Sequence, residues 1–356
     1  MTEILLTIFF ISVLLFFLGS GIWVALSMIG VSAIGMMLFT SRPVGDAMAT
    51  TIWGTSSSWT LTALPLFVWM GEILFRTKLS ENLFKGLSPW MQKLPGGLIH
   101  VNVVGCALFA AISGSSAATV ATVGKMSIPE LRKRNYPEKI LLGSLAGSGT
   151  LGLLIPPSII LIIYGVAVQE SIAKLFIAGI IPGIMIALIF MSYVIIWSLI
   201  NKKSMPKIIE EYSFFEKIKR SKQLLPVIIL ILAVIGSIYT GIATATEAAS
   251  LGVVGALILS YFQKSLTLKT FKSSLLGATK TSCMIAFILA GSTFLSLAMG
   301  FTGLPRNLAL WIQNMELSPY VLIFVLMIFY IILGMFLDGI SAVVLTMAII
   351  EPMIRQ

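Results

Sequence analysis

Charged side chains are scarce in this sequence. They make up 11% of its 356 residues, whereas hydrophobic residues make up 58% and the mean hydropathy is +1.02. An average soluble domain carries about 25% charged residues, so the composition excludes an ordinary soluble protein. Long apolar runs fill most of the chain, and the sequence therefore predicts an all-α polytopic membrane protein.

Cysteine and histidine are nearly absent. Cys106 and Cys283 lie within apolar runs and lack metal-like spacing, so they predict neither a disulfide framework nor a zinc site. His100 is the only histidine. It cannot form a proton relay alone, which favours sodium over proton coupling in a carrier. An intramembrane serine protease using Ser113 or Ser115 is an alternative, but His100 is poorly placed as its base.

Acidic residues are outnumbered by basic ones, 14 against 24, which gives a formal net charge of +10. A basic balance can indicate a nucleic-acid partner. Here the basic residues lie in short loops between apolar runs, where they orient membrane spans toward the cytoplasm. The sequence therefore predicts that the chain lies in a lipid bilayer and that it has no nucleic-acid partner.

Two apolar stretches between residues 98 and 158 are interrupted by small polar residues: FAAISGSSAATVATVG (109–124) and AGSGTLGLLIPPS (146–158). An unpaired backbone amide or carbonyl in lipid costs several kcal/mol, so a broken helix is tolerated only where it lines a buried or watery cavity. Freed carbonyls and nearby hydroxyls are hard oxygen ligands suited to a small cation. The candidate hydroxyls are those of Ser113, Ser115, Ser116, Ser148 and Thr150.

The first interruption predicts a re-entrant hairpin over residues 98–131. Its limbs are about 12 to 15 residues each, short of the ~20 needed to cross a bilayer. Lys93 precedes it and the cluster Arg132, Lys133, Arg134 follows, so both ends are expected on the cytoplasmic side.

Residues 40–59 are read as a polar stretch and residues 83–93 as an interfacial amphipathic piece. The other runs that predict spans are residues 4–18, 22–39, 61–75, 140–163 and 172–200.

The second half repeats this order of elements. Spans at residues 224–239, 243–262 and 282–299 are followed by an amphipathic segment at 304–315 and an apolar run at 321–337. The break LDGISA (337–342) shares its Gly, Ser and Ala with ISGSSA (112–117), and following the spans puts this hairpin on the outer side. We therefore expect a first inverted repeat at 1–200, a basic cytoplasmic linker at 201–222, and a second repeat at 223–356 with its hairpin at 321–356. Inverted repeats whose broken elements meet near the midplane are typical of secondary transporters.

The chain resembles the large membrane subunit of tripartite ATP-independent periplasmic (TRAP) transporters, the family of C4-dicarboxylate and sialic acid permeases. The matching stretches are ALPLFVWMGEILF (63–75), LPGGLIHVNVVGCALFAAISGSSAATVATVG (94–124), GTLGLLIPPSIILIIYG (149–165), IAKLFIAGIIPG (172–183) and GIATATEAASLGVVGAL (241–257). The resemblance implies an elevator-type, sodium-coupled importer of organic acids in a bacterial inner membrane. Its implied partners are a small membrane subunit and a periplasmic binding protein, with sodium as coupling ion and no other cofactor.

By similarity to that family, the broken segments would hold the ion and the substrate. The sodium candidates are Ser113, Gly114, Ser116, Ser148, Gly149, Asp338 and Gly339. The substrate candidates are Ser115, Ser116, Thr119, Thr150, Pro156, Pro157 and Ser341. Asp338 stands out because a charge within a membrane run costs about 2.5 to 3.5 kcal/mol and is seldom kept without a role. Glu72 and Glu247 are read as structural, the first pairing near Arg76 and the second capping a helix.

One departure from the family pattern concerns the end of the sequence. Family members usually continue into a further broken span with a TPPxG-like segment, the counterpart of Ile155-Pro156-Pro157, whereas this sequence ends at Gln356. The second repeat is therefore expected to be incomplete. Two alternatives remain at this point: a sodium-coupled carboxylate carrier of another broken-helix family that uses no binding protein, and a non-transporting truncated fragment.

Overall fold

The structure is a computed structural model that describes residues 2–76, 79–206, 212–222, 224–303, 305, 307, 310, 314–315, 318–335 and 339–355. Within these ranges the regular elements are all helical, which confirms the predicted class. The chain divides into two compact units. Unit 1 comprises residues 1–61, 163–170 and 282–356, and unit 2 comprises residues 62–162 and 171–281.

Unit 1 contains the first three helices and the last three described ones. The first three are α1 (Thr2–Gly19), α2 (Val24–Phe39) and α3 (Val44–Ser56). The last three are α14 (Leu268–Thr302), whose second part from residue 282 lies in this unit, α16 (Pro319–Gly334) and α17 (Gly339–Arg355).

The core of unit 1 forms along α14. Met36, Phe294 and Ala298 are fully buried together. A Cβ on Gly291 would lie 2.8 Å from the carbonyl oxygen of Ala25, so this glycine permits α14 to approach α2 closely. Ser292 Oγ donates a 2.6 Å hydrogen bond to the carbonyl of Val344 in α17. These contacts join the start and the end of the chain in one packed unit.

Unit 2 holds the remaining elements. Its first half contains η1 (Trp59–Thr62, which begins in unit 1), α4 (Ala63–Phe75), α5 (Leu79–Met91), α6 (Ile99–Ser113), α7 (Ser116–Lys133), α8 (Glu138–Gly149), η2 (Thr150–Leu153) and the start of α9 (Ile159–Ala167). Its second half contains α10 (Ile172–Ile200), η3 (Lys202–Ser204), α11 (Phe214–Ser221), α12 (Leu225–Tyr239), α13 (Ala245–Phe262) and the start of α14.

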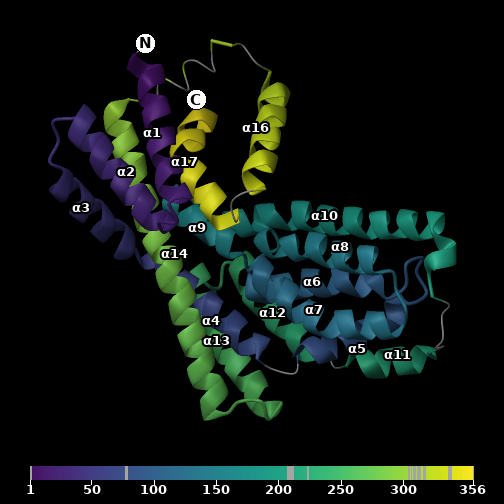
Figure 1. Ribbon diagram of the computed structural model, residues 1–356. Helices are drawn as coiled ribbons and strands as arrows, with labels where there is room; N and C mark the ends of the chain where they lie inside the picture. Colours follow the sequence, from purple (N-terminus) through teal and green to yellow (C-terminus); the bar gives the residue numbers. More distant parts are fainter. Residues whose placement is uncertain are drawn as a thin grey trace. The chain divides into compact units, whose positions relative to one another are not determined.

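Helix α6 is the centre of unit 2. It contacts α4, α5, α7, α8 and α10, and Figure 1 shows α10, α8, α6 and α7 lying side by side. Twelve of its 15 residues are buried. Because α6 is apolar on nearly all sides, it can be placed in a core only where neighbours surround it. This central position holds the end of α6, and therefore the first interruption, in place.

Among the residues that the structure describes, three helices are long and apolar enough by themselves to cross a membrane, namely α10, α13 and α14. The number rises to five if two pairs of consecutive helices each count as one span. Helix α10 is 29 residues long and only 17% of its most apolar window is buried inside the protein. Such an exposed apolar surface agrees with a polytopic membrane protein.

Two segments are more ordered than the sequence suggested. The polar stretch at residues 40–59 contains α3, which follows Pro43 and has Asp46 in its first turn. The basic linker at 201–222 contains α11, which begins with a capping box between Ser213 and Glu216. Trp90 of α5 donates a 2.8 Å hydrogen bond to Ser221, and Lys217 lies over its ring. The missed signal in α11 was this S-x-x-E spacing.

The two units do not coincide with the two sequence halves. Each unit takes segments from both, so the units are built by packing across the expected repeats. The expected repeats at 1–200 and 223–356 concern internal symmetry, which is a different property from compact packing, and they stay a prediction. The re-entrant course of both hairpins also stays a prediction. The amphipathic segment expected at residues 304–315 lies largely outside the described residues.

Candidate functional site

The first interruption is a sharp turn between α6 and α7. Gly114 ends α6 in the left-handed conformation, with φ 58° and ψ 8°, and its amide donates to the carbonyl of Ala110. Ser115 is extended, and its hydroxyl accepts from the amide of Ala118 at 3.4 Å as the N-cap of α7. A left-handed residue followed by an N-cap ends one helix and starts the next within two residues. The predicted break at 113–116 is therefore confirmed.

Hydroxyl groups bridge this turn from both sides. Ser113 Oγ and Thr119 Oγ1 lie 2.9 Å apart, and Thr119 Oγ1 donates to the carbonyl of Ser115 at 2.7 Å. Thr119 is fully buried and Ser113 nearly so. Because these bonds satisfy buried polar groups that lipid or core could not, they hold the turn in one shape. Two of the predicted site residues thus act inside the turn itself.

The second interruption separates α8 from α9. Helix α8 ends at Gly149, the chain continues through η2, and a cis peptide bond joins Pro156 to Pro157. Ser158 is fully buried and donates to the carbonyl of Leu153. Two consecutive prolines lack amide donors, so a continuous helix through them is excluded. The predicted broken middle of the 140–163 run is confirmed.

The two interruptions are in backbone contact with each other. The amide of Ile159 donates to the carbonyl of Gly114 at 3.3 Å. A Cβ on Gly114 would lie 2.9 Å from the carbonyl oxygen of Pro157, and one on Gly152 would lie 2.8 Å from the carbonyl carbon of Ser115. Real Cβ atoms almost never come so close to another atom, so side chains are excluded at both positions. Glycine therefore sets the distance between the two broken segments.

A pocket of about 290 Å³ opens beside this contact. It contains hydroxyl groups from the first break together with one carboxylate, that of Glu72 in α4. Glu72 Oε2 accepts a 2.8 Å ion-pair hydrogen bond from Arg76, whose guanidinium also donates to the carbonyl of Ser273. The lining residues are Val68, Gly71, Glu72, Phe75, Ser113, Ser115, Ala117, Ala118, Ala121, Ile159 and Thr281.

The pocket unites only part of the predicted set. Ser113 and Ser115 line it, and Gly114 lies between them. Ser116 is partly exposed at the start of α7. Pro156 and Pro157 are buried, and the carbonyl of Pro157 is the one that approaches Gly114.

The predicted residues at the end of α8 point elsewhere. Ser148 is fully buried, and its hydroxyl donates to the carbonyls of Ser144 at 2.6 Å and Asn102 at 3.4 Å. Thr150 is exposed and donates to the carbonyl of Gly147. A Cβ on Gly149 would overlap Val120 of α7. This end of α8 packs against α6 and α7 and brings no side-chain oxygen to the pocket.

The predicted residues of the second half belong to unit 1. Gly339 begins α17, and Ser341 is buried two residues later. Asp338 lies outside the described residues. Within unit 1, Tyr330 of α16 and Thr346 of α17 join their hydroxyls at 2.7 Å.

Glu72 and Thr281 are the lining residues with polar side chains that the sequence did not assign to a site. Glu72 was read as a structural partner of Arg76, and the structure confirms the pair. Glu72 is also one of the residues that line the pocket together with Ser113 and Ser115. Its sequence signal was its position inside the apolar run 61–75, since an ionisable residue in such a run marks a functional site by default. Thr281 carries no comparable signal.

The comparison with protein families settles the class of this chain. The family model described as "Tripartite ATP-independent periplasmic transporter, DctM component" matches residues 9–356. The chain belongs to this family. It is therefore a subunit of a TRAP transporter and not an enzyme, which removes the serine-protease alternative. Family membership also overturns the alternative of a carrier from another broken-helix family.

Individual relatives of this TRAP subunit carry several substrate names. The C4-dicarboxylate TRAP transporter large permease protein of Pseudomonas aeruginosa is 33% identical over 89% of this chain and 73% of its own length. The sialic acid TRAP transporter large permease protein of Vibrio cholerae is 30% identical over 94% and 78%. The 2,3-diketo-L-gulonate TRAP transporter large permease protein of Escherichia coli is 31% identical over 87% and 72%.

The position of His100 agrees with a role other than catalysis. It is fully buried at the start of α6, and its Nε2 lies 2.8 Å from the carbonyl oxygen of Pro95. Ser113 and Ser115 lie at the other end of the same helix. A general base must lie within hydrogen-bond reach of its nucleophile. This TRAP subunit therefore uses its only histidine to fix the turn before α6.

Proposed function

We propose that this TRAP subunit is the large permease of a sodium-coupled importer of organic acids in a bacterial inner membrane. The observation that carries the proposal is the backbone contact between two helix interruptions beside a pocket lined by Ser113, Ser115 and Glu72. Broken helices that line a cavity provide free carbonyls for cations and helix N-termini for anions. The N-terminus of α7, with Ser115 as its cap, is such an end.

The proposed substrate class follows from the family and its relatives. Those named above are permeases for C4-dicarboxylates, sialic acid and 2,3-diketo-L-gulonate, all of which carry carboxylate groups. A carboxylate would be drawn to the positive end of α7. The family description names a tripartite periplasmic system. We therefore propose a periplasmic binding protein that delivers the acid and a small membrane subunit as the two partners.

The proposed sodium ligands come from both predicted breaks. In unit 2 they are Ser113, Gly114 and Ser116, whose hydroxyl and carbonyl oxygens suit a hard cation. In unit 1 they are Asp338 and Gly339, by sequence pattern alone. Ser148 and Gly149 we assign to packing instead, because the Ser148 hydroxyl donates to the carbonyls of Ser144 and Asn102 and Gly149 lies against Val120. For substrate, Ser115 and Ser116 are the strongest candidates in unit 2.

Uptake of a radiolabelled dicarboxylate tests the coupling ion. The chain is reconstituted in liposomes with its small membrane subunit and binding protein, in sodium or in choline medium. We expect uptake in sodium only, and an apparent sodium affinity about tenfold weaker in Ser113→Ala, which loses one oxygen ligand worth about 1.4 kcal/mol. Ser250→Ala is the matched control, because Ser250 is exposed on α13 and its hydroxyl bonds only within its own helix.

A second variant addresses the other break. Asp338→Asn keeps the size of the side chain and removes its charge, so we expect weaker sodium dependence of uptake. Equal uptake in sodium and choline by the unmodified protein would refute sodium coupling. If Ser113→Ala and Ser250→Ala behave alike, the pocket beside Gly114 is not the cation site.

A further inference from the structure

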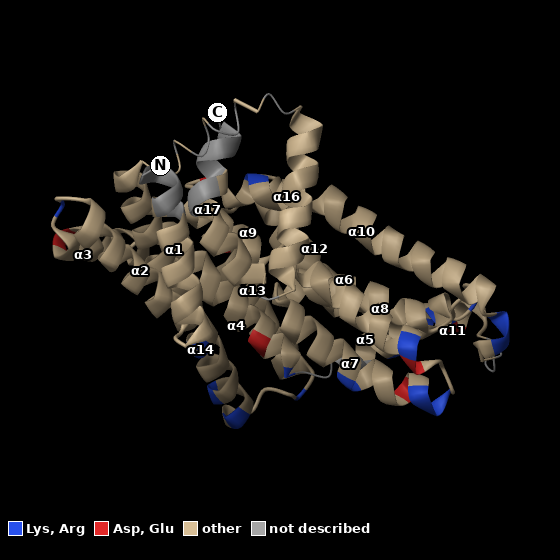
Figure 2. Cartoon of the chain, turned by 45° about the horizontal axis from the view of Figure 1, so that its top comes forward, with Lys and Arg blue, Asp and Glu red and all other residues tan. Residues whose placement is uncertain are grey.

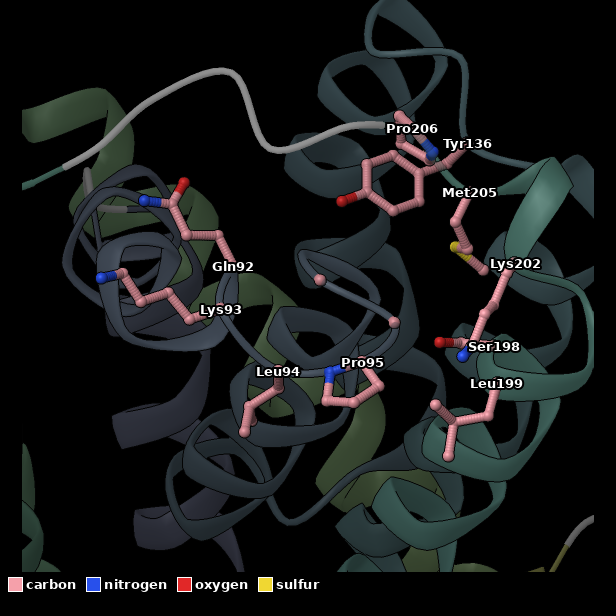
Figure 3. Close-up of a pocket in the computed structure, with 12 residues that line it drawn as sticks. Gln92, Lys93, Leu94, Pro95, Tyr136, Ser198, Leu199, Lys202, Met205 and Pro206 are labelled. Carbon is pink, nitrogen blue, oxygen red and sulfur yellow. The ribbon is translucent and has the colours of Figure 1, made fainter.

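A second pocket of about 270 Å³ lies at one end of unit 2, between the turn that follows α5, the turn before α8, and the end of α10 with the segment after it. Figure 3 shows it as an open space bordered by the turn before α6 on one side and by the end of α10 on the other. Its lining residues are Gln92, Lys93, Leu94, Pro95, Gly96, Gly97, Tyr136, Ser198, Leu199, Lys202, Met205 and Pro206. None of the transport residues discussed above belongs to it.

The pocket lies in the most basic part of unit 2. Lys93 and Lys202 line it, and Figure 2 shows further Lys and Arg residues around α7, α8, α10 and α11. Two acids in the described part of this region are engaged: Glu130 pairs with Arg134 at 2.9 Å, and Glu138 pairs with Arg132. Among the described residues, neither pocket lysine has an ion-pair partner. Basic loops of this kind mark the cytoplasmic side of a membrane protein.

Two hydroxyl groups face the space. Tyr136 Oη accepts a 3.0 Å hydrogen bond from the amide of Leu98, so its own proton is free to be donated. Burial raises the pKa of Tyr136, with smaller opposing effects from Leu98 and Arg134, and the group remains a neutral donor at physiological pH. Ser198 of α10 is 4% exposed, and Figure 3 shows the hydroxyls of both residues directed into the pocket.

The walls of the pocket are fixed by packing. Tyr136, Trp197 and Met205 pack on a buried cluster formed by Ile99, Ile140 and Val194. Gly96 and Gly97 have φ of 102° and 55°, a conformation that side chains rarely adopt. A site whose donors are held before the ligand arrives loses less entropy on binding. The packed walls therefore keep the pocket open and its donors in position for a ligand.

An apolar surface continues from the pocket along α10. Leu199 lines the pocket, and Ile196 and Ile200 on the same helix are 57% and 76% exposed. Helix α10 is also the most hydropathic of the candidate spans. A ligand held here would thus have its anionic group near the lysines and its apolar part along α10. That combination describes a phospholipid at a membrane surface.

We propose that this pocket binds the phosphate group of an anionic phospholipid of the cytoplasmic leaflet. Lys93 and Lys202 supply the positive charge, Tyr136 and Ser198 donate hydrogen bonds to the phosphate oxygens, and the acyl chains lie along α10. A soluble phosphate ester would present the same phosphate group to these lysines and hydroxyls. The exposed apolar side chains of α10 favour the lipid.

Native mass spectrometry of the full chain tests the proposal. The protein is extracted from vesicles of phosphatidylcholine with or without phosphatidylglycerol, and retained lipid is measured. We expect one retained phosphatidylglycerol, bound about thirtyfold more weakly in Lys93→Gln/Lys202→Gln, since each basic residue near an anionic lipid contributes about fivefold. Ser198→Ala removes a single hydroxyl from a helix, and we expect about fivefold weaker binding from it.

Lys203→Gln is the matched control, because Lys203 is equally exposed on the same short turn and does not line the pocket. Equal loss of lipid in Lys203→Gln and Lys93→Gln/Lys202→Gln would show a diffuse charge effect and overturn the site. Full retention in the Ser198→Ala and double-lysine variants would overturn it as well. Displacement of the lipid by millimolar glycerol 3-phosphate would identify a soluble phosphate as the ligand and reject the lipid assignment.

Discussion

The pair α6–α7 and the pair α16–α17 have the same order of elements in sequence, an apolar run, a break rich in Gly and Ser, and a second limb. Their packing differs. Helix α6 buries 12 of its 15 residues, whereas α16 has none that are buried among its 16. Tyr320 and Ile331 of α16 are 85% and 60% exposed, and Met335 at its C-cap is 76% exposed. Within its own unit, α16 meets α17 through the hydroxyls of Tyr330 and Thr346.

The difference shows what hydropathy alone does not encode. Both helices are apolar all round, so composition predicts for each either a protein core or a lipid environment. The distinguishing feature is the surroundings of their glycines. Gly114 has backbone atoms about it, whereas no described residue lies within 4 Å of a Cβ on Gly334. Close glycine contacts mark the pair that is packed inside its unit, whereas the described side chains of α16 are left largely exposed.

The largest expected effect is at Gly114. Alanine there would adopt a left-handed conformation and meet the carbonyl of Pro157, so we expect a loss of about 2 to 5 kcal/mol in unfolding free energy. The measurement is an unfolding titration in detergent followed by tryptophan fluorescence. Gly143→Ala in α8 is the control, since its Cβ meets nothing within 4 Å. Equal stability of both variants would remove the distinction between the two pairs.

A smaller effect is expected inside the same turn. Thr119→Val keeps the shape of the side chain and removes its bonds to Ser113 and to the carbonyl of Ser115. Because Thr119 is fully buried, we expect a loss of about 1 to 2 kcal/mol. The same titration measures it. Unchanged stability would show that the hydroxyl network does not hold the break.

The corresponding bond of the second pair should matter less. Tyr330→Phe removes the partly buried hydrogen bond between the hydroxyls of Tyr330 and Thr346. The Thr346 hydroxyl keeps its bond to the carbonyl of Ala342. We expect a loss of about 0.5 to 1 kcal/mol. A larger loss than that of Thr119→Val, measured side by side, would reverse the order of the two pairs.

The smallest effect is expected at Gly334. Alanine at the end of α16 has open space around its Cβ, so the stability should change by no more than about 0.5 kcal/mol. The melting temperature in detergent provides the measurement. A marked destabilisation would mean that α16 is covered as closely as α6 and would end the contrast.

Much of the helical order could be predicted from the sequence. The apolar run 172–200 predicted both ends of α10. The small residues at 113–116 and the prolines at 156–157 predicted the two interruptions. These features are local, because glycine, proline and capping residues act on the backbone within a few positions. Helix α3 was missed, since its polar composition hid a helix that begins after Pro43.

The composition of the pocket could be predicted only in part. Ser113 and Ser115 carry a local signal, the break itself, and they line the pocket. Ser148 and Thr150 follow the same composition rule, yet their hydroxyls bond to carbonyls of their own neighbourhood. Which oxygens turn inward depends on the rotation of α8 against α6 and α7. That rotation is a matter of tertiary packing that no short motif specifies.

The first break and the start of α7 line the pocket with short side chains, those of Ser113, Ser115, Ala117, Ala118 and Ala121. Alanine has no rotamer to change and serine reorients only its hydroxyl, so this wall adjusts little when a side chain turns. The opposite wall carries the flexible side chains of Glu72 and Phe75. If the pocket is the proposed transport site, an entering ligand would therefore displace these two side chains, and α4 would supply the adjustable side of the pocket.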